Sequence, residues 1–152
     1  MSAVGDALAA LRDVLDGAAV PWFLFGAQAI AVRAAPRATQ DVDVTIDASQ
    51  TPLTMLVPRL EAAGIFHRYP EVAESLLRTS AVVPMIHRAT GMEIDIVIAG
   101  SALEQSALAA ATRVEIDGVS VPVASSTHLA VMKTLAGRGK DLQEVVENYG
   151  RF

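Results

Sequence analysis

The sequence predicts an α/β (α+β) fold, a small mixed β-sheet flanked by helices, in a single domain over residues 1–152. Segments with apolar residues at helical spacing alternate with short apolar runs typical of strands. Some of these strands are joined by hairpin-like turns and others by helical segments, which is typical of a mixed sheet. A chain of this length can bury one hydrophobic core.

The expected elements follow one another with short connections. Helices are expected over residues 3–16, 28–33, 51–63, 72–78, 102–111 and 127–136, and from 141 to about 148. Strands are expected over residues 22–25, 41–46, 81–87, 92–98, 113–116 and 119–121.

Apolar periodicity and the placement of glycine and proline set the boundaries in the first half of the chain. Val4, Leu8, Leu11 and Leu15 form one face of the first helix, which Gly17 ends. The strand at 22–25 is a short buried run broken by the glycine that follows it, and a proline ends the short helix at 28–33. The strand at 41–46 alternates acidic and apolar residues, and a proline within 51–63 would cut or kink that helix.

Turn and capping residues set the boundaries in the second half. A four-residue turn at 88–91 joins two strands as a hairpin. Ser101 and Glu104 have the spacing of a capping box. Asp117-Gly118 is a favourable two-residue hairpin turn, and Ser125 or Ser126 can cap the helix that follows.

Composition excludes several classes of protein. Hydrophobic residues make up 52% and charged residues 19%, which excludes a disordered chain. There is no 18-residue apolar run, so no membrane span is expected, and the N-terminus lacks the features of a secretory signal. The absence of cysteine excludes disulfides and a cysteine nucleophile, and we expect a cytoplasmic protein. A net charge of −5 argues against broad coating of nucleic acid but allows a focused RNA site.

Two pairs of acidic residues occur in predicted strands whose other residues are mostly apolar and expected to be buried. Residues i and i+2 of a strand project to the same face, so Asp41 and Asp43 lie together, as do Glu93 and Asp95. Asp95 sits between isoleucines and is favoured over Glu93 as an inner ligand. Same-face carboxylates repel one another, and hard divalent cations prefer such oxygen ligands. The pattern indicates metal-assisted chemistry on a phosphate; the alternative is a solvent-facing edge strand.

Three further segments have both a functional and a plain interpretation. Gly26-Ala27 lies where a strand turns into a helix, so it could cradle a phosphate or simply form a tight turn. Lys133, on an otherwise mostly apolar helix, could reach a triphosphate or extend to solvent. Arg138 and Asp141 belong to a polar segment that could equally be a loop with a helix cap.

These motifs, in this order, resemble the nucleotidyltransferase signature of polymerase-β-type enzymes: a small turn at Gly26-Ala27, then a strand with two acids. Arg37 and Thr39, just ahead of the acids, resemble the AbiEii/AbiGii-type toxin branch, as does the segment from Ser125 to Leu142. The resemblance covers roughly residues 20–146. Ala27 stands where the family usually has glycine or serine.

The resemblance implies a nucleotidyltransferase-like fold, an NTP cosubstrate and Mg²⁺. It implies transfer of a nucleoside monophosphate to a tRNA or protein acceptor by a toxin that has a cognate antitoxin. By position, Asp41, Asp43 and Asp95 resemble the metal ligands, and Asp141 the late acid of the signature. Residues resembling nucleotide contacts are Gly26, Ala27, Arg37, Thr39, Lys133 and Arg138.

Other functions remain open at this point. The chain could be a catalytically degenerate domain that binds a partner, which the Gly26-Ala27 turn favours and the three retained aspartates oppose. It could also be an antitoxin that modifies its toxin, or an enzyme that modifies a small molecule such as an antibiotic. The sequence does not indicate the acceptor, the preferred nucleobase or the oligomeric state.

Overall fold

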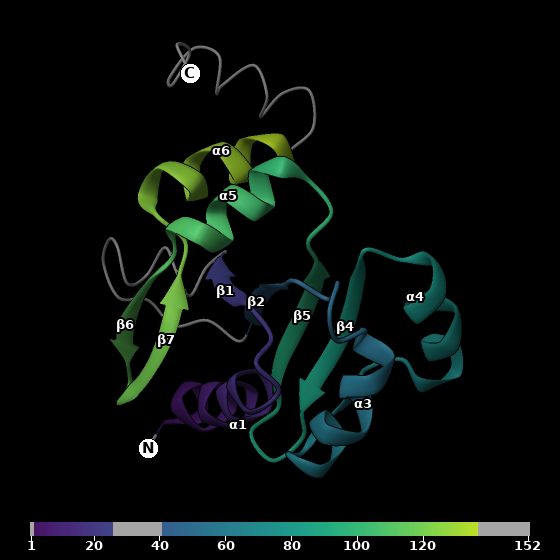
Figure 1. The fold of residues 1–152 in the computed structure, drawn as a ribbon. Coiled ribbons are helices and arrows are strands. Elements are labelled where there is room, and N and C mark those ends of the chain that lie inside the picture. Colours follow the sequence, from purple (N-terminus) through teal and green to yellow (C-terminus); the bar gives the residue numbers. More distant parts are fainter. Residues whose placement is uncertain (1, 26–40, 137–152) are drawn as a thin grey trace.

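Helices and strands make up most of the described part of the computed structural model, which comprises residues 2–25 and 41–136 (Figure 1). The helices there are α1 (Ala3–Gly17), α3 (Leu53–Ala62), α4 (Ala73–Thr79), α5 (Ala102–Ala110) and α6 (Ser126–Ala136), with a 3-10 helix, η1 (Pro70–Val72). The strands are β1 (Trp22–Phe25), β2 (Asp41–Ile46), β3 (Ile65–His67), β4 (Val82–His87), β5 (Met92–Ile98), β6 (Thr112–Ile116) and β7 (Val119–Val123). The expected helices over 28–33 and from 141 lie outside the described residues.

The strands of this described part form one seven-stranded sheet in the order β3-β4-β5-β2-β1-β7-β6. Two neighbouring pairs, β2 with β5 and β1 with β7, are parallel, and the other pairs are antiparallel. The mixed sheet flanked by helices is therefore confirmed. None of the described helices is both long enough and apolar enough to cross a membrane.

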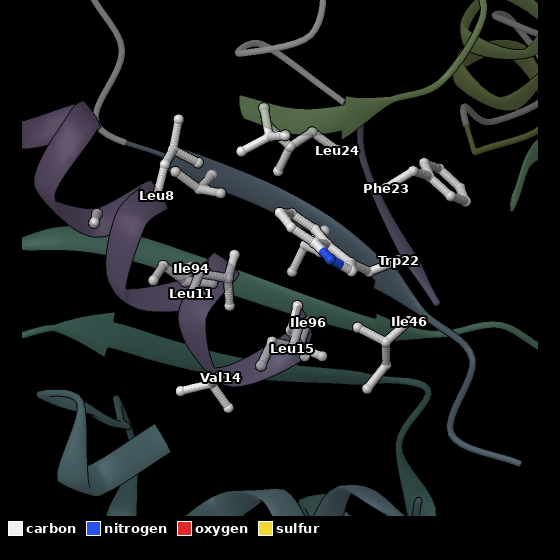
Figure 2. Close-up of a cluster of buried hydrophobic side chains, with 14 of the residues drawn as sticks. Leu8, Leu11, Val14, Leu15, Trp22, Phe23, Leu24, Ile46, Ile94 and Ile96 are labelled. Atoms are coloured by element: carbon white, nitrogen blue, oxygen red, sulfur yellow. The ribbon is translucent and has the colours of Figure 1, made fainter. Parts of the chain in front are cut away.

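Helix α1 covers one face of the sheet. Its residues Leu8, Leu11 and Leu15 are fully buried and pack over Ile94 and Ile96 of β5 (Figure 2). The helix begins at a cap in which the Ser2 hydroxyl accepts a hydrogen bond from the backbone N–H of residue 5. The apolar face predicted for residues 3–16 is thus confirmed, and it supplies much of the core.

Successive side chains of β2 point to opposite faces of the sheet, so its core residues and its acidic residues lie on different faces. Val42, Val44 and Ile46 are fully buried in the core that α1 covers. Asp41 and Asp43 alternate with them and project to the opposite face. A one-residue slip would exchange these two sets, so burial of the valines and the isoleucine pins the acids to the far face.

The structure specifies three features that the sequence analysis expected. Of the two effects expected of Pro58, a cut does not occur, because helix α3 continues through Pro58. Ser125 is the residue that caps α6, because its hydroxyl accepts from the backbone N–H of His128 at 3.1 Å. The β6–β7 turn at Asp117-Gly118 has the expected positive φ values of 48° and 83°.

Strand β3 was not expected, and Pro84 of β4 explains where it ends. The backbone N–H of Arg68, the residue after β3, donates to the Pro84 carbonyl at 3.0 Å. In an antiparallel ladder Pro84 would return a hydrogen bond to Arg68, but proline has no N–H. The ladder therefore stops at His67, and Arg68 lies directly beside Pro84.

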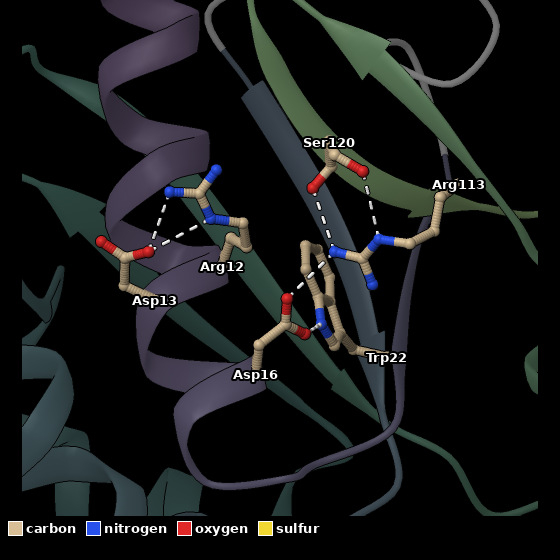
Figure 3. Close-up of polar contacts among 6 residues, drawn as sticks. All are labelled: Arg12, Asp13, Asp16, Trp22, Arg113 and Ser120. Carbon is tan, nitrogen blue, oxygen red and sulfur yellow. Dashed lines mark hydrogen bonds and ion pairs between the residues drawn. The ribbon is translucent and has the colours of Figure 1, made fainter.

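A polar cluster links the end of α1 to β1 and to the edge strand β6 (Figure 3). The Asp16 carboxylate accepts hydrogen bonds from the Trp22 indole N–H at 2.8 Å and from Arg113 of β6 at 2.9 Å. Arg113 also donates to the hydroxyl and carbonyl of Ser120. These contacts set the position of α1 relative to β1 and the β6–β7 hairpin.

Candidate active site

The four acidic residues identified in the sequence form a compact block across two neighbouring strands. In the parallel pairing of β2 with β5, Asp41 lies opposite Glu93 and Asp43 lies opposite Asp95. All four project to the face away from α1. Two acidic pairs that stand about fifty residues apart along the chain are thereby brought side by side.

The ionised form of Asp43 is disfavoured at its position in this block. Burial, and then the neighbouring Asp95 and Asp41 carboxylates, together raise the pKa of Asp43 from the ordinary 3.8 to about 6. A carboxylate in this position is disfavoured both by desolvation and by like charge. The block is therefore a place where a cation would be bound favourably.

Arg68 supplies a positive charge to this block, and the sequence analysis did not identify it. Its Nη2 lies 2.8 Å from Asp95 Oδ1, and its Nη1 lies 3.1 Å from Glu93 Oε1. Burial opposes the charge on the guanidinium, but the hydrogen bond and charge of Asp95 outweigh burial and raise the pKa of Arg68. No motif marks Arg68, because its role depends on the order β3-β4-β5 in the sheet.

The donor set suits a hydrated magnesium ion. Within residues 2–25 and 41–136, no group of three or more acidic or histidine side chains is close enough to hold a metal ion alone. Mg²⁺ is usually held by one or two carboxylates, several waters and the phosphates of a substrate. Asp43 and Asp95, directly opposite each other with Asp41 alongside, fit that mode of binding.

The remaining predicted site residues come before β2 or after β7 in the sequence. Their side chains lie outside the described part of the structure. Gly26, Ala27, Arg37 and Thr39 belong to residues 26–40, and Arg138 and Asp141 to residues 137–152. Lys133 lies on α6, whose backbone is described there without that side chain. Their contribution to the site stays a prediction.

The start of α6 lies at the same end of the strands as the acidic block, because of how β7, β1 and β2 pair. Strand β7 runs parallel to β1, and the N–H of Ala124 donates to the Leu24 carbonyl at 3.2 Å. The next residue of β1, Phe25, lies opposite Asp43. The helix that carries Lys133 therefore begins one strand away from the carboxylates.

His128 ties α5 and α6 together near this end of the strands. Its Nδ1 lies 2.6 Å from the Ser125 hydroxyl, and its Nε2 lies 3.0 Å from the Ser106 hydroxyl. Each ring nitrogen therefore has a hydroxyl partner, one on α5 and one at the start of α6. This arrangement is that of a structural histidine linking two helices.

Comparison with known proteins supports the assignment of the fold. The sequence matches no protein-family model and no curated protein. Among solved structures, the lincosamide adenylyltransferase LnuA with bound lincomycin superposes with a TM-score of 0.57 at 16% identity, over 91% of each chain. A Thermotoga maritima protein assigned as a nucleotidyltransferase gives 0.53 at 15% identity, over 97% of this chain and 95% of that one. At these identities the likeness shows that the chain has the fold of these nucleotidyltransferases.

Proposed function

We propose that the protein is a metal-dependent nucleotidyltransferase that moves a nucleoside monophosphate from an NTP to an acceptor. The observation that carries this proposal is the pairing of Asp43 with Asp95 across β2 and β5, with Asp41 on the same face. The likeness of the whole chain to two nucleotidyltransferase folds supports it. Carboxylates grouped on one face can hold a metal ion that polarises a phosphoryl oxygen and activates the attacking group.

In this reaction the acceptor oxygen attacks the α-phosphorus, the bond to the bridging oxygen breaks, and pyrophosphate leaves. Asp41, Asp43 and Asp95 would hold Mg²⁺, which neutralises charge on the triphosphate and lowers the pKa of the attacking hydroxyl. Asp95 would also be the carboxylate placed to take up the acceptor proton. Asp41 and Asp43 would orient the triphosphate for in-line attack.

The segments on either side of the acidic block would bind the nucleotide. The backbone N–H groups of Gly26 and Ala27 would contact the phosphates, as is typical of a small turn leading into a helix. Lys133 would reach the triphosphate from α6. Arg37, Thr39, Arg138 and Asp141 are assigned supporting contacts to nucleotide or acceptor from the resemblance alone.

Two kinds of acceptor have support. The AbiEii-like motifs favour a toxin that modifies tRNA or a protein and is held in check by a cognate antitoxin. The likeness to LnuA over nearly the whole of both chains favours a small-molecule hydroxyl instead. Expression of the chain alone separates these roles, since a toxin arrests growth and a small-molecule-modifying enzyme or an antitoxin does not.

Calorimetric titration with ATP, GTP, CTP and UTP tests the proposal before any acceptor is known. We expect Mg²⁺-dependent binding of at least one nucleotide, and loss of that binding in Asp41→Ala. Transfer of label from an [α-³²P]NTP to tRNA, partner protein or small molecule then identifies the acceptor, and Asp43→Asn should abolish that transfer. Absence of binding for all four nucleotides would favour a degenerate partner-binding domain over the enzyme.

A further inference from the structure

Arg68 reaches the acidic block because of its place in one row of residues across the sheet. Its backbone N–H contacts Pro84, Pro84 lies opposite Asp95, and Asp95 lies opposite Asp43. The Arg68 side chain spans the intervening strand β4 to reach Asp95 on β5. The end of β3, set by Pro84, thus determines where the guanidinium lies.

The guanidinium has several anchors, including the neighbouring Tyr69, over whose ring it lies at 5.6 Å. In addition to Asp95 and Glu93, it donates from Nη1 to the backbone carbonyl of Met85 at 3.3 Å. Its side chain is 18% exposed, whereas that of Asp95 is 33% and that of Glu93 is 48% exposed. Arginine presents donors in a rigid planar fork, so these anchors fix its orientation in a way that a lysine could not reproduce.

The contact with Asp95 occupies only one of its two carboxylate oxygens. Arg68 binds Oδ1 and leaves Oδ2 uncovered by the guanidinium, so Oδ2 is the oxygen that would bind a metal ion or an acceptor proton. A carboxylate held by a hydrogen bond to one oxygen has a fixed rotamer, which lowers the entropy lost when the other oxygen binds a ligand. Arg68 also offsets part of the repulsion between Asp95 and Asp43.

We propose that Arg68 is a positioning residue for Asp95, which orients that carboxylate for metal binding and for contact with the acceptor. This inference rests on the proposed function. Arg68 acts through Asp95 and touches neither nucleotide nor acceptor. The competing interpretation is that Arg68 blocks the site by competing with the metal ion for Asp95, and the two interpretations predict opposite changes in metal affinity.

The test is Mn²⁺ binding to the protein without nucleotide, measured from the electron paramagnetic resonance signal of free Mn²⁺. We expect Arg68→Gln to weaken Mn²⁺ binding by about 10- to 100-fold, as is typical when a group that orients a metal ligand is removed. Arg68→Lys keeps the charge without the fork and should show a smaller loss. Transfer assays should show a fall in kcat, with the KM for NTP changed less than threefold.

Two control variants separate positioning from general effects. Arg88, which lies over the Phe66 ring at 3.7 Å, is an exposed arginine in the turn that follows β4, and Arg88→Gln should leave Mn²⁺ binding within twofold of the wild type. Glu93→Gln removes the more exposed partner of Arg68 and should have a smaller effect than Arg68→Gln. Circular dichroism and thermal unfolding establish that each variant is folded; if Arg68→Gln is not, Arg68→Lys decides.

The outcomes distinguish failure of this inference from failure of the proposed function. Wild-type Mn²⁺ binding that is unchanged in both Arg68 variants would overturn the positioning role while leaving the enzyme intact. Tighter Mn²⁺ binding in Arg68→Gln would overturn it in favour of competition. Wild-type protein that binds neither Mn²⁺ nor nucleotide would overturn the proposed function and the positioning role together.

Discussion

Replacing Asp43 with asparagine should stabilise the protein near neutral pH while it abolishes nucleotidyl transfer. The pKa of Asp43 in the folded protein is raised from 3.8 to about 6, mainly by burial and then by Asp95 and Asp41. A raised carboxyl pKa means that the folded state binds the proton more tightly than the unfolded state does. Stability from this group is therefore present at low pH and is lost as pH rises from about 4 to about 6.

The size of the effect follows from the same shift. Each tenfold change in proton affinity corresponds to about 1.4 kcal/mol, so the ionised Asp43 side chain lowers the free energy of unfolding at pH 7 by at most about 3 kcal/mol. Because the site is only partly buried, solvent screening reduces this to about 1–2 kcal/mol. Asparagine has nearly the same shape and no charge, so Asp43→Asn should gain that amount at pH 7 and nothing at pH 4.

Urea unfolding at pH 4 and pH 7 in metal-free buffer measures this difference. Asp13→Asn is the matched control, because Asp13 is an exposed aspartate on α1 whose removal should change stability by less than about 0.5 kcal/mol. A gain of equal size at both pH values would show that packing, and not charge, is responsible. A loss of stability at pH 7 would refute the electrostatic reasoning altogether.

Three further results are expected. Mg²⁺ should raise the midpoint of thermal unfolding of the wild type but not of Asp43→Asn, since a ligand that binds only the folded state stabilises it; equal shifts would place the metal elsewhere. Thr45→Val should stabilise the protein by about 1 kcal/mol in urea unfolding, because the fully buried Thr45 hydroxyl has no hydrogen-bond partner in the described structure. Asp16→Ala should lower the free energy of unfolding by about 1–2 kcal/mol, because the buried Trp22 N–H loses its acceptor and the ion pair with Arg113 is removed; an unchanged midpoint would show that this cluster contributes little.

Much of the acidic block could be predicted because alternation along a strand is a local property. Asp41 and Asp43 had to share a face once Val42 and Val44 were assigned to the core. The same reasoning placed Asp95 beside Ile94 and Ile96. The fold class followed from counting such segments and from the turns between them.

The pairing of these acids across strands could not be predicted in the same way. Parallel pairing of β2 with β5 brings Asp43 opposite Asp95, but the roughly fifty residues between them contain two α-helices, a 3-10 helix and two other strands. No local signal sets the register of strands that meet only in the tertiary structure. The sequence could therefore predict which acids share a face, but not which acid lies opposite which.

Arg68 was not predicted for a related reason, although the position of Pro84 in the sequence bears on where its strand ends. A three-residue strand is too short for alternation to reveal it, so β3 read as an irregular segment. Pro84 was visible in the sequence as a proline inside a predicted strand, which indicates that the neighbouring strand must lose a ladder hydrogen bond there. The residue that faces this proline keeps one backbone hydrogen bond, from its N–H to the Pro84 carbonyl, and loses the return bond. That residue is Arg68, and its side chain reaches Asp95 because Arg68, Pro84 and Asp95 stand in one row across β3, β4 and β5.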